Sequence, residues 1–448
     1  MTNETLLSFG KRNFPAFGHR NFRLFWVGQC VSLIGTWMQN IGQSWLVLKL
    51  TGSPMKLGLV TAIQFLPVLL FSIFAGPFVD RFPKKKMLLF TQSMLMLLAF
   101  ALAALTGFGL VRYWHVLVLA LLLGFTNTLD IPTRQSFIIE LVGRENLMNA
   151  VSLNATMFNL ARIIGPAVAG IMIGAIGIAP CFVLNGLSFI AVIIALTRIG
   201  TGSAPGNAAG KAQEKVGKQS ATSRSAASQE AGEDDPPEVS RRFELSALLR
   251  ETGEGLRYIE SKPGILWPLA LLGSLSLFVL NFNVIIPVFA RDIIRGDAAE
   301  YGFLMTAMGI GSLAGAVTLA VKSSSGPKIA RLLAGAFGMS AFTLLIGLQR
   351  SFLLSCVLLA LTGFSTILCT TQANALVQIR SEDGMRGRVM SVFSMVFGGV
   401  TPIGSLYAGA LIEGAGPAIC LVVSGIIGLV TAGICSSAVY RSGGARKP

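Results

Sequence analysis

Apolar residues along the 448-residue chain are gathered into twelve long runs, separated by shorter polar segments. A helix needs ~20 apolar residues to cross the hydrocarbon core of a bilayer, and the runs are of that order. The strict apolar–polar alternation of a membrane β-barrel is absent. We therefore expect an all-α membrane protein with twelve transmembrane helices. They cover Phe22–Leu50, Leu57–Val79, Met87–Gly107, Trp114–Gln135, Ala150–Ile176, Pro180–Leu196, Ile265–Ala290, Ala299–Val321, Ile329–Leu348, Phe352–Thr371, Val389–Ile412 and Ala418–Ala438.

The second half of the chain repeats part of the first. With one shift of 239 positions, small residues of predicted spans four and five fall on identical residues of spans ten and eleven. The pairs are Gly124 and Gly363, Ser152 and Ser391, Gly165 and Gly404, and Gly170 and Gly409. Such a repeat predicts two pseudo-symmetric six-helix bundles that can rock about a shared cavity.

A polar segment without aromatic residues, over 200–240, joins the two halves, and it has too little apolar surface to fold alone. It is followed by an amphipathic helix over 243–260, which lies either on the inner membrane face or on the protein's own cytoplasmic loops. We divide the chain into a tail (1–21), a bundle (22–199), a linker (200–264), a second bundle (265–438) and a tail (439–448).

Composition excludes a soluble enzyme and a disordered chain, since 53% of residues are hydrophobic and 13% charged. The net charge of +15 does not indicate nucleic-acid binding, because its placement follows membrane topology. With the N-terminus inside, 29 of the 36 Lys and Arg residues fall on inner segments and six on outer ones. Cytoplasmic loops accumulate such residues, so both termini are expected in the cytoplasm.

Redox, metal and enzymatic chemistry find little support in the sequence. The six cysteines are scattered without a CxxC pair, and there are only two histidines, so we expect no metal and no cofactor. No Gly-rich loop ending in Lys-Ser or Lys-Thr is present for ATP. No nucleophile stands in a catalytic setting, and we do not expect an enzyme.

A glycine, an acid and a basic run stand between predicted spans two and three. The residues are Gly76, Asp80, Arg81, Lys84 and Lys85. They form either an ordinary positive-inside hairpin or a gate latch. The stretch resembles the signature loop of the major facilitator superfamily, Gly-x-Leu-x-Asp-Arg-x-Gly-Arg-Lys.

That resemblance implies how the loop works. The aspartate would meet the cytoplasmic N-terminus of span eleven, whose helix dipole favours an acid, and Lys84 would pair with an acid at the end of span four. Pro83 replaces the second glycine of the pattern, so the turn differs. The equivalent loop of the second half, Lys322–Arg331, has no acid, and a second latch is degenerate.

Predicted span five carries Gly165, Pro166 and Gly170. Small residues let helices pack closely, which is one interpretation of the pattern. It also resembles the Gly-Pro-x-x-Gly-Gly core of the superfamily's antiporter motif, with Ala169 at the fifth position, and this favours export. The superfamily's span-four motif is absent, because Ala120 takes the place of its arginine.

Two ionisable residues lie within predicted spans, where charges are costly and usually functional. Asp130 either exchanges a proton as the cavity opens and closes, or forms a permanent salt bridge with Arg81, Lys84 or Arg162. Arg162, near the middle of span five, either binds an anionic substrate or pairs with Asp130.

Amide side chains at span depth either line the cavity or hydrogen-bond neighbouring helices. The candidates are Gln29, Gln39, Asn40, Gln43, Asn127, Asn154, Asn159, Asn281, Asn283, Gln372 and Asn374. Spans one, four, seven and ten, which line the cavity in the superfamily, contain several of them.

The stretches 130–135, 147–150, 161–166 and 301–311 resemble the enterobactin-exporter-like and macrolide-efflux-like branch of the superfamily. The resemblance implies a monomeric secondary transporter of the bacterial cytoplasmic membrane that exports a small amphipathic siderophore or drug in exchange for protons. Uptake, or flipping of a lysophospholipid or other lipid, are alternatives within the same fold. A non-transporting membrane sensor or scaffold is the alternative from a different class.

Overall fold

The apolar runs fold into helices in a computed structural model, which describes residues 15–143, 145–200, 245–322 and 326–444. At 72–73, 76–77, 80, 245–252, 440 and 442–444 it describes the backbone alone. The described residues contain no β-strand, and the expected all-α architecture is confirmed. Backbone N–H and C=O groups cannot bond to lipid, so helices that satisfy them internally are the natural solution.

Six long helices form the first bundle and the rest of the described chain forms the second. The first contains α2 (Arg20–Thr51), α3 (Pro54–Asp80), α4 (Lys84–Gly107), α5 (Tyr113–Val142), α6 (Leu147–Ile176) and α7 (Ala179–Arg198), preceded by the short η1 (Pro15–Gly18). After α9 (Leu245–Ser261), the second contains α10 (Pro263–Phe278), α11 (Phe282–Asp292), α12 (Ala298–Val321), α13 (Ile329–Leu348), α14 (Phe352–Arg380), α15 (Arg386–Ser394), the π-helical η3 (Met395–Gly399), α16 (Thr401–Ala415) and α17 (Pro417–Gly444).

Eleven described segments are long and apolar enough to cross a membrane by length and composition. In that count α10 with α11, and α15 with η3 and α16, are single segments. The 32-residue α2 is not among them, since it carries several amide side chains, yet it packs within the first bundle. Together with α2, these segments correspond to the twelve spans predicted from the sequence.

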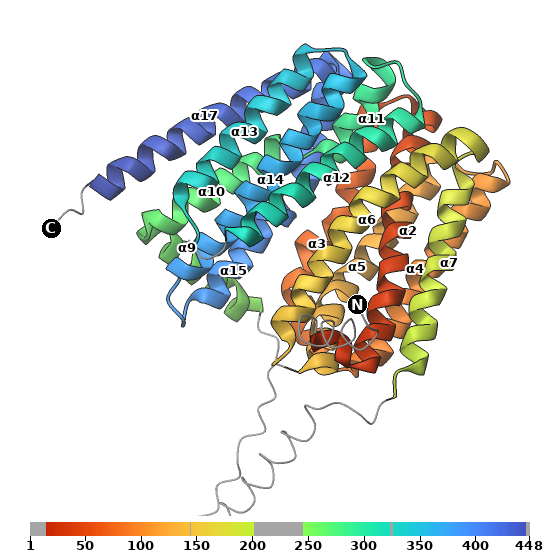
Figure 1. Cartoon of the computed structure of the whole chain (residues 1–448), viewed down its shortest axis with the longest axis horizontal. Coiled ribbons are helices and arrows are strands. Elements are labelled where there is room, and N and C mark those ends of the chain that lie inside the picture. Colours follow the sequence, from red (N-terminus) through yellow and green to blue (C-terminus); the bar gives the residue numbers. More distant parts are fainter. Residues whose placement is uncertain (1–14, 144, 201–244, 323–325, 445–448) are drawn as a thin grey trace, which may run out of the picture.

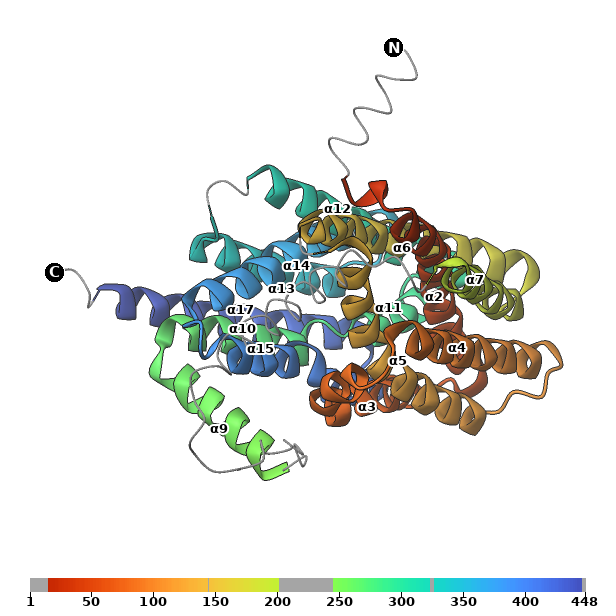
Figure 2. The ribbon, with the colours of Figure 1, turned by 90° about the horizontal axis from the view of Figure 1, so that it is seen from below.

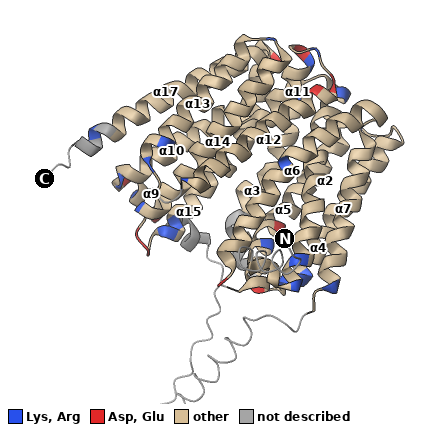
Figure 3. Cartoon of the chain, viewed as in Figure 1, with Lys and Arg blue, Asp and Glu red and all other residues tan. Residues whose placement is uncertain are grey.

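The two bundles lie side by side, as the views in Figures 1 and 2 agree. In Figure 1, α2 begins at the lower end of the first bundle and α17 ends at the left, beyond α9 and α15. Lys and Arg gather near the start of α2 and around α9 and α15 in Figure 3. We call this the basic end, and the opposite one the far end. The helices of the two bundles converge at the far end and diverge toward the basic end.

Local sequence signals set the turns at the far end. Gly52 ends α2 with φ of +65°, a conformation that side chains with a β-carbon rarely adopt. Ser53 then begins α3: its Oγ accepts a hydrogen bond from the Lys56 N–H, and Pro54 follows at the first helical position. Asp297 and Glu300 cap the start of α12 reciprocally.

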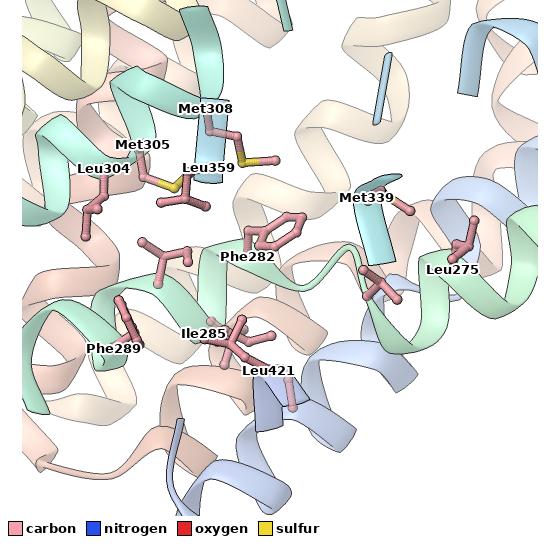
Figure 4. Packing of buried hydrophobic residues seen from close by; sticks show 14 of the residues in the cluster. Leu275, Phe282, Ile285, Phe289, Leu304, Met305, Met308, Met339, Leu359 and Leu421 are labelled. Atoms are coloured by element: carbon pink, nitrogen blue, oxygen red, sulfur yellow. The ribbon is translucent and has the colours of Figure 1, made fainter. Parts of the chain in front are cut away.

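The predicted seventh span, Ile265–Ala290, is broken into α10 and α11. Asn281 lies in the break, where it is buried and its Nδ2 donates to the carbonyl of Leu277 at 2.7 Å. The Asn281 side chain therefore supplies a hydrogen-bond donor to a backbone carbonyl near the interrupted end of α10. Figure 4 shows Phe282 and Ile285 just beyond the break, packed among Leu, Met and Phe side chains of the second bundle.

Glycines bring α6 and α12 into close contact across the two bundles. A β-carbon added at Gly302 would lie 2.5 Å from the Pro166 carbonyl oxygen and 2.8 Å from the Gly170 Cα. A hydrogen bond also joins these two helices: Thr306 Oγ1 donates to the Ile163 carbonyl at 3.2 Å. The span-five residues predicted from sequence thus form the seam between the bundles, and Gly165 packs against α2 at Trp37.

The helix α9 packs on the second bundle. Ile259 is buried, Glu254 forms an ion pair with Arg388 at 3.1 Å, and the Glu382 N–H donates to the Tyr258 hydroxyl at 3.2 Å. Of the two alternatives left open by the sequence, these contacts favour packing on the protein's own loops. Residues 201–244, which include most of the predicted linker, lie outside the described ranges.

Gly302→Ala should destabilise the protein by about 1–3 kcal/mol, the usual effect of overpacking, because its methyl group meets backbone atoms of α6. Unfolding of the purified protein in a detergent titration measures the change. Gly433→Ala is the matched control: its β-carbon meets open space, so it should be neutral or stabilise by up to about 1 kcal/mol. Equal stability of the two variants would contradict the close seam.

Candidate functional site

The two bundles are hydrogen-bonded to each other at the far end. Glu413, near the end of α16, accepts through Oε2 from the Ser53 hydroxyl at 2.7 Å and from the Met55 N–H at 3.0 Å. Arg291, at the end of α11, donates to the Gly52 carbonyl at 3.3 Å. Glu413 thus caps the N-terminus of α3 from the other bundle, where the helix dipole favours an acid.

A small polar pocket lies next to this contact, between α2, α3 and α11. Asn40, Gln43 and Asn283 line it, together with Gln64 and Thr61. Gln43 Nε2 donates to Gln64 Oε1 at 2.9 Å. The lining contains no charged side chain. We call it the amide pocket; it brings together three of the amides predicted from sequence and adds Gln64.

A second pocket, of about 240 Å³, lies between the bundles nearer the basic end. Asn127 and Gln135 of α5 face Ser391 and Ser394 of α15 across it, and Val68 of α3 completes the wall. We call it the vestibule. Of these polar residues, only Asn127 was predicted to line a cavity. Gln135 lies at the very end of predicted span four, and the short hydroxyl side chains of Ser391 and Ser394 do not stand out in an apolar sequence.

A third pocket, of about 440 Å³, belongs to the first bundle alone. It lies between α3, α4 and α5, and its lining is apolar and rich in aromatic rings, including Phe71, Phe78, Phe90 and Phe125. Thr128 of α5 borders both this pocket and the vestibule.

Several predicted amides lie elsewhere, in hydrogen bonds that hold helices together. Gln39 Oε1 accepts from Asn185 Nδ2 at 2.6 Å inside the first bundle, and Gln372 Oε1 accepts from the Lys328 N–H at 2.8 Å. Asn159 bonds its own helix at the Ala155 carbonyl. The remaining candidates are Gln29, which is buried, and Asn154 and Asn374, which are partly exposed.

Asp130 is fully buried in α5, and its partner is Arg134, one turn further along the same helix. Thr91 and Gln92 of α4 also donate to Oδ1, at 2.7 and 2.8 Å. The three cations considered from the sequence are therefore not its partners. The i, i+4 spacing was the available signal, because residues four apart share one helix face.

Arg162 lies halfway along α6, half-buried, with its guanidinium carbon 5.8 Å from the centre of the Trp37 ring. Trp37 in turn makes an edge contact with Phe158 at 5.7 Å. The expected pair with Asp130 is not formed. A cation over the face of a tryptophan is attracted by the negative π-face.

The signature loop is a tight turn from α3 into α4. Lys84 Nζ donates to the Val79 carbonyl at 2.8 Å and also acts electrostatically on Glu140, near the end of α5. Lys85 Nζ reaches the Ile199 carbonyl at 2.6 Å. Arg81 is exposed. At Gly76 and Asp80 the structure describes the backbone alone. The expected contact of the Asp80 side chain with the N-terminus of span eleven therefore stays a prediction.

Solved structures of several transporters share this fold. The nucleoside transporter NupG matches with a TM-score of 0.67 at 13% identity, covering 94% of this chain and 99% of its own. A bacterial homolog of the human lysosomal transporter Spinster, in an inward-facing and unoccupied conformation, matches with a TM-score of 0.67 at 12% identity, covering 93% of this chain and 96% of its own. These likenesses show the fold, two helix bundles of a multi-pass membrane protein.

The family profile described as transmembrane secretion effector matches residues 12–219 and 238–443. The chain therefore belongs to this family of the major facilitator superfamily, in its efflux-like branch. The staphyloferrin A transporter of Staphylococcus aureus is 23% identical over 86% of this chain and 87% of its own. The multidrug efflux pump Tap of Mycolicibacterium fortuitum is 26% identical over 83% and 84%. The macrolide efflux protein A of Streptococcus pyogenes is 22% identical over 92% and 95%.

Glu413→Ala should open the far end. It removes an N-cap that bridges the bundles, worth about 1 kcal/mol, which is a roughly fivefold change in a two-state equilibrium. Spin labels at Leu110 and Arg350, on outer turns of the two bundles, measure the separation in lipid nanodiscs.

Glu300→Ala is the matched control, because its carboxylate bonds the Asp297 N–H within one bundle. Identical label distances in wild type and both variants would show that Glu413 does not hold the far end closed.

Proposed function

We propose that this protein is a secondary active exporter of a small amphipathic organic compound, working by alternating access. The observation that carries the proposal is the contrast between the two ends. Hydrogen bonds from Glu413 and Arg291 join the bundles at the far end, while the vestibule lies between them on the basic side. A compound would enter from the basic end and leave after the far-end contacts break.

The direction and the kind of cargo are supported by the relatives. Their names concern siderophore transport, multidrug efflux and macrolide efflux. The pockets suit such cargo, since amides and hydroxyls can hydrogen-bond polar groups while the surrounding walls are apolar. The basic end faces the cytoplasm in this proposal, which puts both termini inside a bacterial cytoplasmic membrane. The protein acts as a monomer.

Proton entry is the proposed driving force. Among the described acidic side chains, Asp130 alone lies more than one turn from the end of its span. In this conformation its carboxylate is held by an ion pair with Arg134 and by hydrogen bonds from Thr91 and Gln92. Proton uptake by Asp130 then requires the contact with Arg134 to break as the bundles rock. Asp130 would thus alternate between an ion-paired state and a protonated state.

Lipid translocation is a second candidate, favoured by the aromatic pocket between α3, α4 and α5. An acyl chain would fit its apolar walls, and Thr128 connects it to the vestibule. A lipid exporter would then draw its cargo sideways from the bilayer rather than from the cytoplasm.

Proteoliposomes loaded with a mixed panel of siderophores, macrolides and fluorescent lysophospholipids test the function. We expect loss of one soluble compound class that depends on an imposed proton gradient. Transfer of lysophospholipid alone would favour the flippase. Movement of no compound by folded protein, under any gradient, would contradict transport and favour a sensor or scaffold.

Asp130→Asn should flatten the pH dependence of transport, because the amide cannot take up and release a proton. Arg134 would be left unpaired, so the double variant Asp130→Asn/Arg134→Gln serves beside it. Initial rates of transport between about pH 5.5 and 8.5 give the profile. A pH profile of wild-type shape in both variants would remove Asp130 from proton coupling.

A further inference from the structure

Arg162 is a cation in the middle of the molecule to which no described side chain offers a counter-charge. Among the residues that the structure describes, none gives its side chain a hydrogen bond or an ion pair; its one contact of this kind is the ring of Trp37. The Arg162 side chain is partly exposed. Asp130, the acid considered as its partner from the sequence, is ion-paired with Arg134.

A lone charge at this depth is expensive for the fold. Ionisable side chains within membrane spans normally pair with each other or face a cavity through which something passes. The cation–π contact with Trp37 offsets only part of the loss of hydration. An arginine also cannot escape by losing its proton, because its guanidinium stays charged in proteins.

Trp37 and Arg162 lie on helices that lead to the pockets between the bundles. On α2, Trp37 lies one turn from Asn40 and two turns from Ser44, which line the amide pocket, so the three share a helix face. On α6, Asn154, Phe158 and Arg162 follow at four-residue spacing and lead from the basic end to the pair. The Arg162 backbone carbonyl meets α12 at Gly309, so the site lies where both bundles join.

We propose that Arg162 binds the anionic group of the transported compound, with Trp37 and Phe158 contacting an apolar or aromatic part of the same molecule. The substrate class is thus an organic anion that carries a carboxylate, phosphate or sulfonate beside a ring or chain. The fork of guanidinium N–H groups matches such oxygens in pairs. This inference rests on the proposed function and narrows its substrate.

Equilibrium dialysis against the full-length protein in nanodiscs tests the site without requiring transport. The probes are 1-naphthaleneacetate, the neutral 1-naphthaleneacetamide and the cationic 1-naphthalenemethylamine, which share one ring system. Empty nanodiscs correct for partition into lipid. We expect the acetate to bind about tenfold more tightly than the amide, as a charge-assisted hydrogen bond allows. The amine should bind most weakly.

Arg162→Gln should abolish the preference for acetate over amide, and Arg162→Lys should retain part of it. Arg198→Gln, which removes an exposed cation at the end of α7, should keep the whole preference. Equal binding of acetate and amide by the wild-type protein overturns the inference, and this result does not depend on any variant folding. A preference that survives in Arg162→Gln overturns it as well.

The two proposals fail separately. Gradient-driven efflux of neutral compounds with no preference for the acetate would leave the exporter and remove the anion site. Preferential acetate binding without flux of any compound would keep the anion site and contradict the exporter.

Discussion

The close approaches of α6 to α12 and of α3 to α16 are the constraint on which the arrangement of the two bundles depends. Gly302 and Gly170 place the helix backbones nearly in contact, and Thr306 adds a hydrogen bond halfway along. A hydrophobic driving force between helices is weak in lipid, so such contacts rely on tight van der Waals packing. Small residues also present a smooth surface. A seam of this kind can hold two bundles together and still allow them to pivot.

The fold was predictable because lipid leaves the chain few options. Long apolar runs had to become helices, and the repeat in small residues indicated two halves. The break between α10 and α11 was not predictable, because an asparagine within a span does not by itself indicate an interruption of the helix. Asn281 stood out in the sequence, but one polar residue in a span does not reveal whether it faces a cavity or satisfies a loose backbone end.

The site was predictable only in part, and for a related reason. Polarity at span depth identified Asn40, Gln43 and Asn283, which lie around one pocket, but it equally identified Gln39, which joins two helices of one bundle. Which side of a helix faces the other bundle depends on the rotation of each span. Arg134 shows another limit: it lies at the end of predicted span four and was not considered as a partner of Asp130. Its helix extends to Val142, and residues four apart on it form the ion pair.

Irregular structure is concentrated in the second bundle. Span seven is interrupted near Asn281, and span eleven contains the π-helical turn η3, whose Gly399 packs against Leu69 of α3. Such turns often occur at functional sites, and broken spans supply bending points. Among the described helices of the first bundle, the spans run unbroken, so that bundle is suited to move as a rigid unit against a more deformable neighbour.

The unpaired charge of Arg162 also has an electrical consequence. A membrane potential of about 100 mV is worth ~2.3 kcal/mol for one elementary charge moved across the whole bilayer. An empty binding site that carries this cation changes its exposure within that field when the bundles rock, whereas a site neutralised by an anion does not. An inside-negative voltage would then draw the empty carrier back toward the cytoplasm and leave the loaded one unaffected. The resting potential of the cell would thereby reset the cycle after each release.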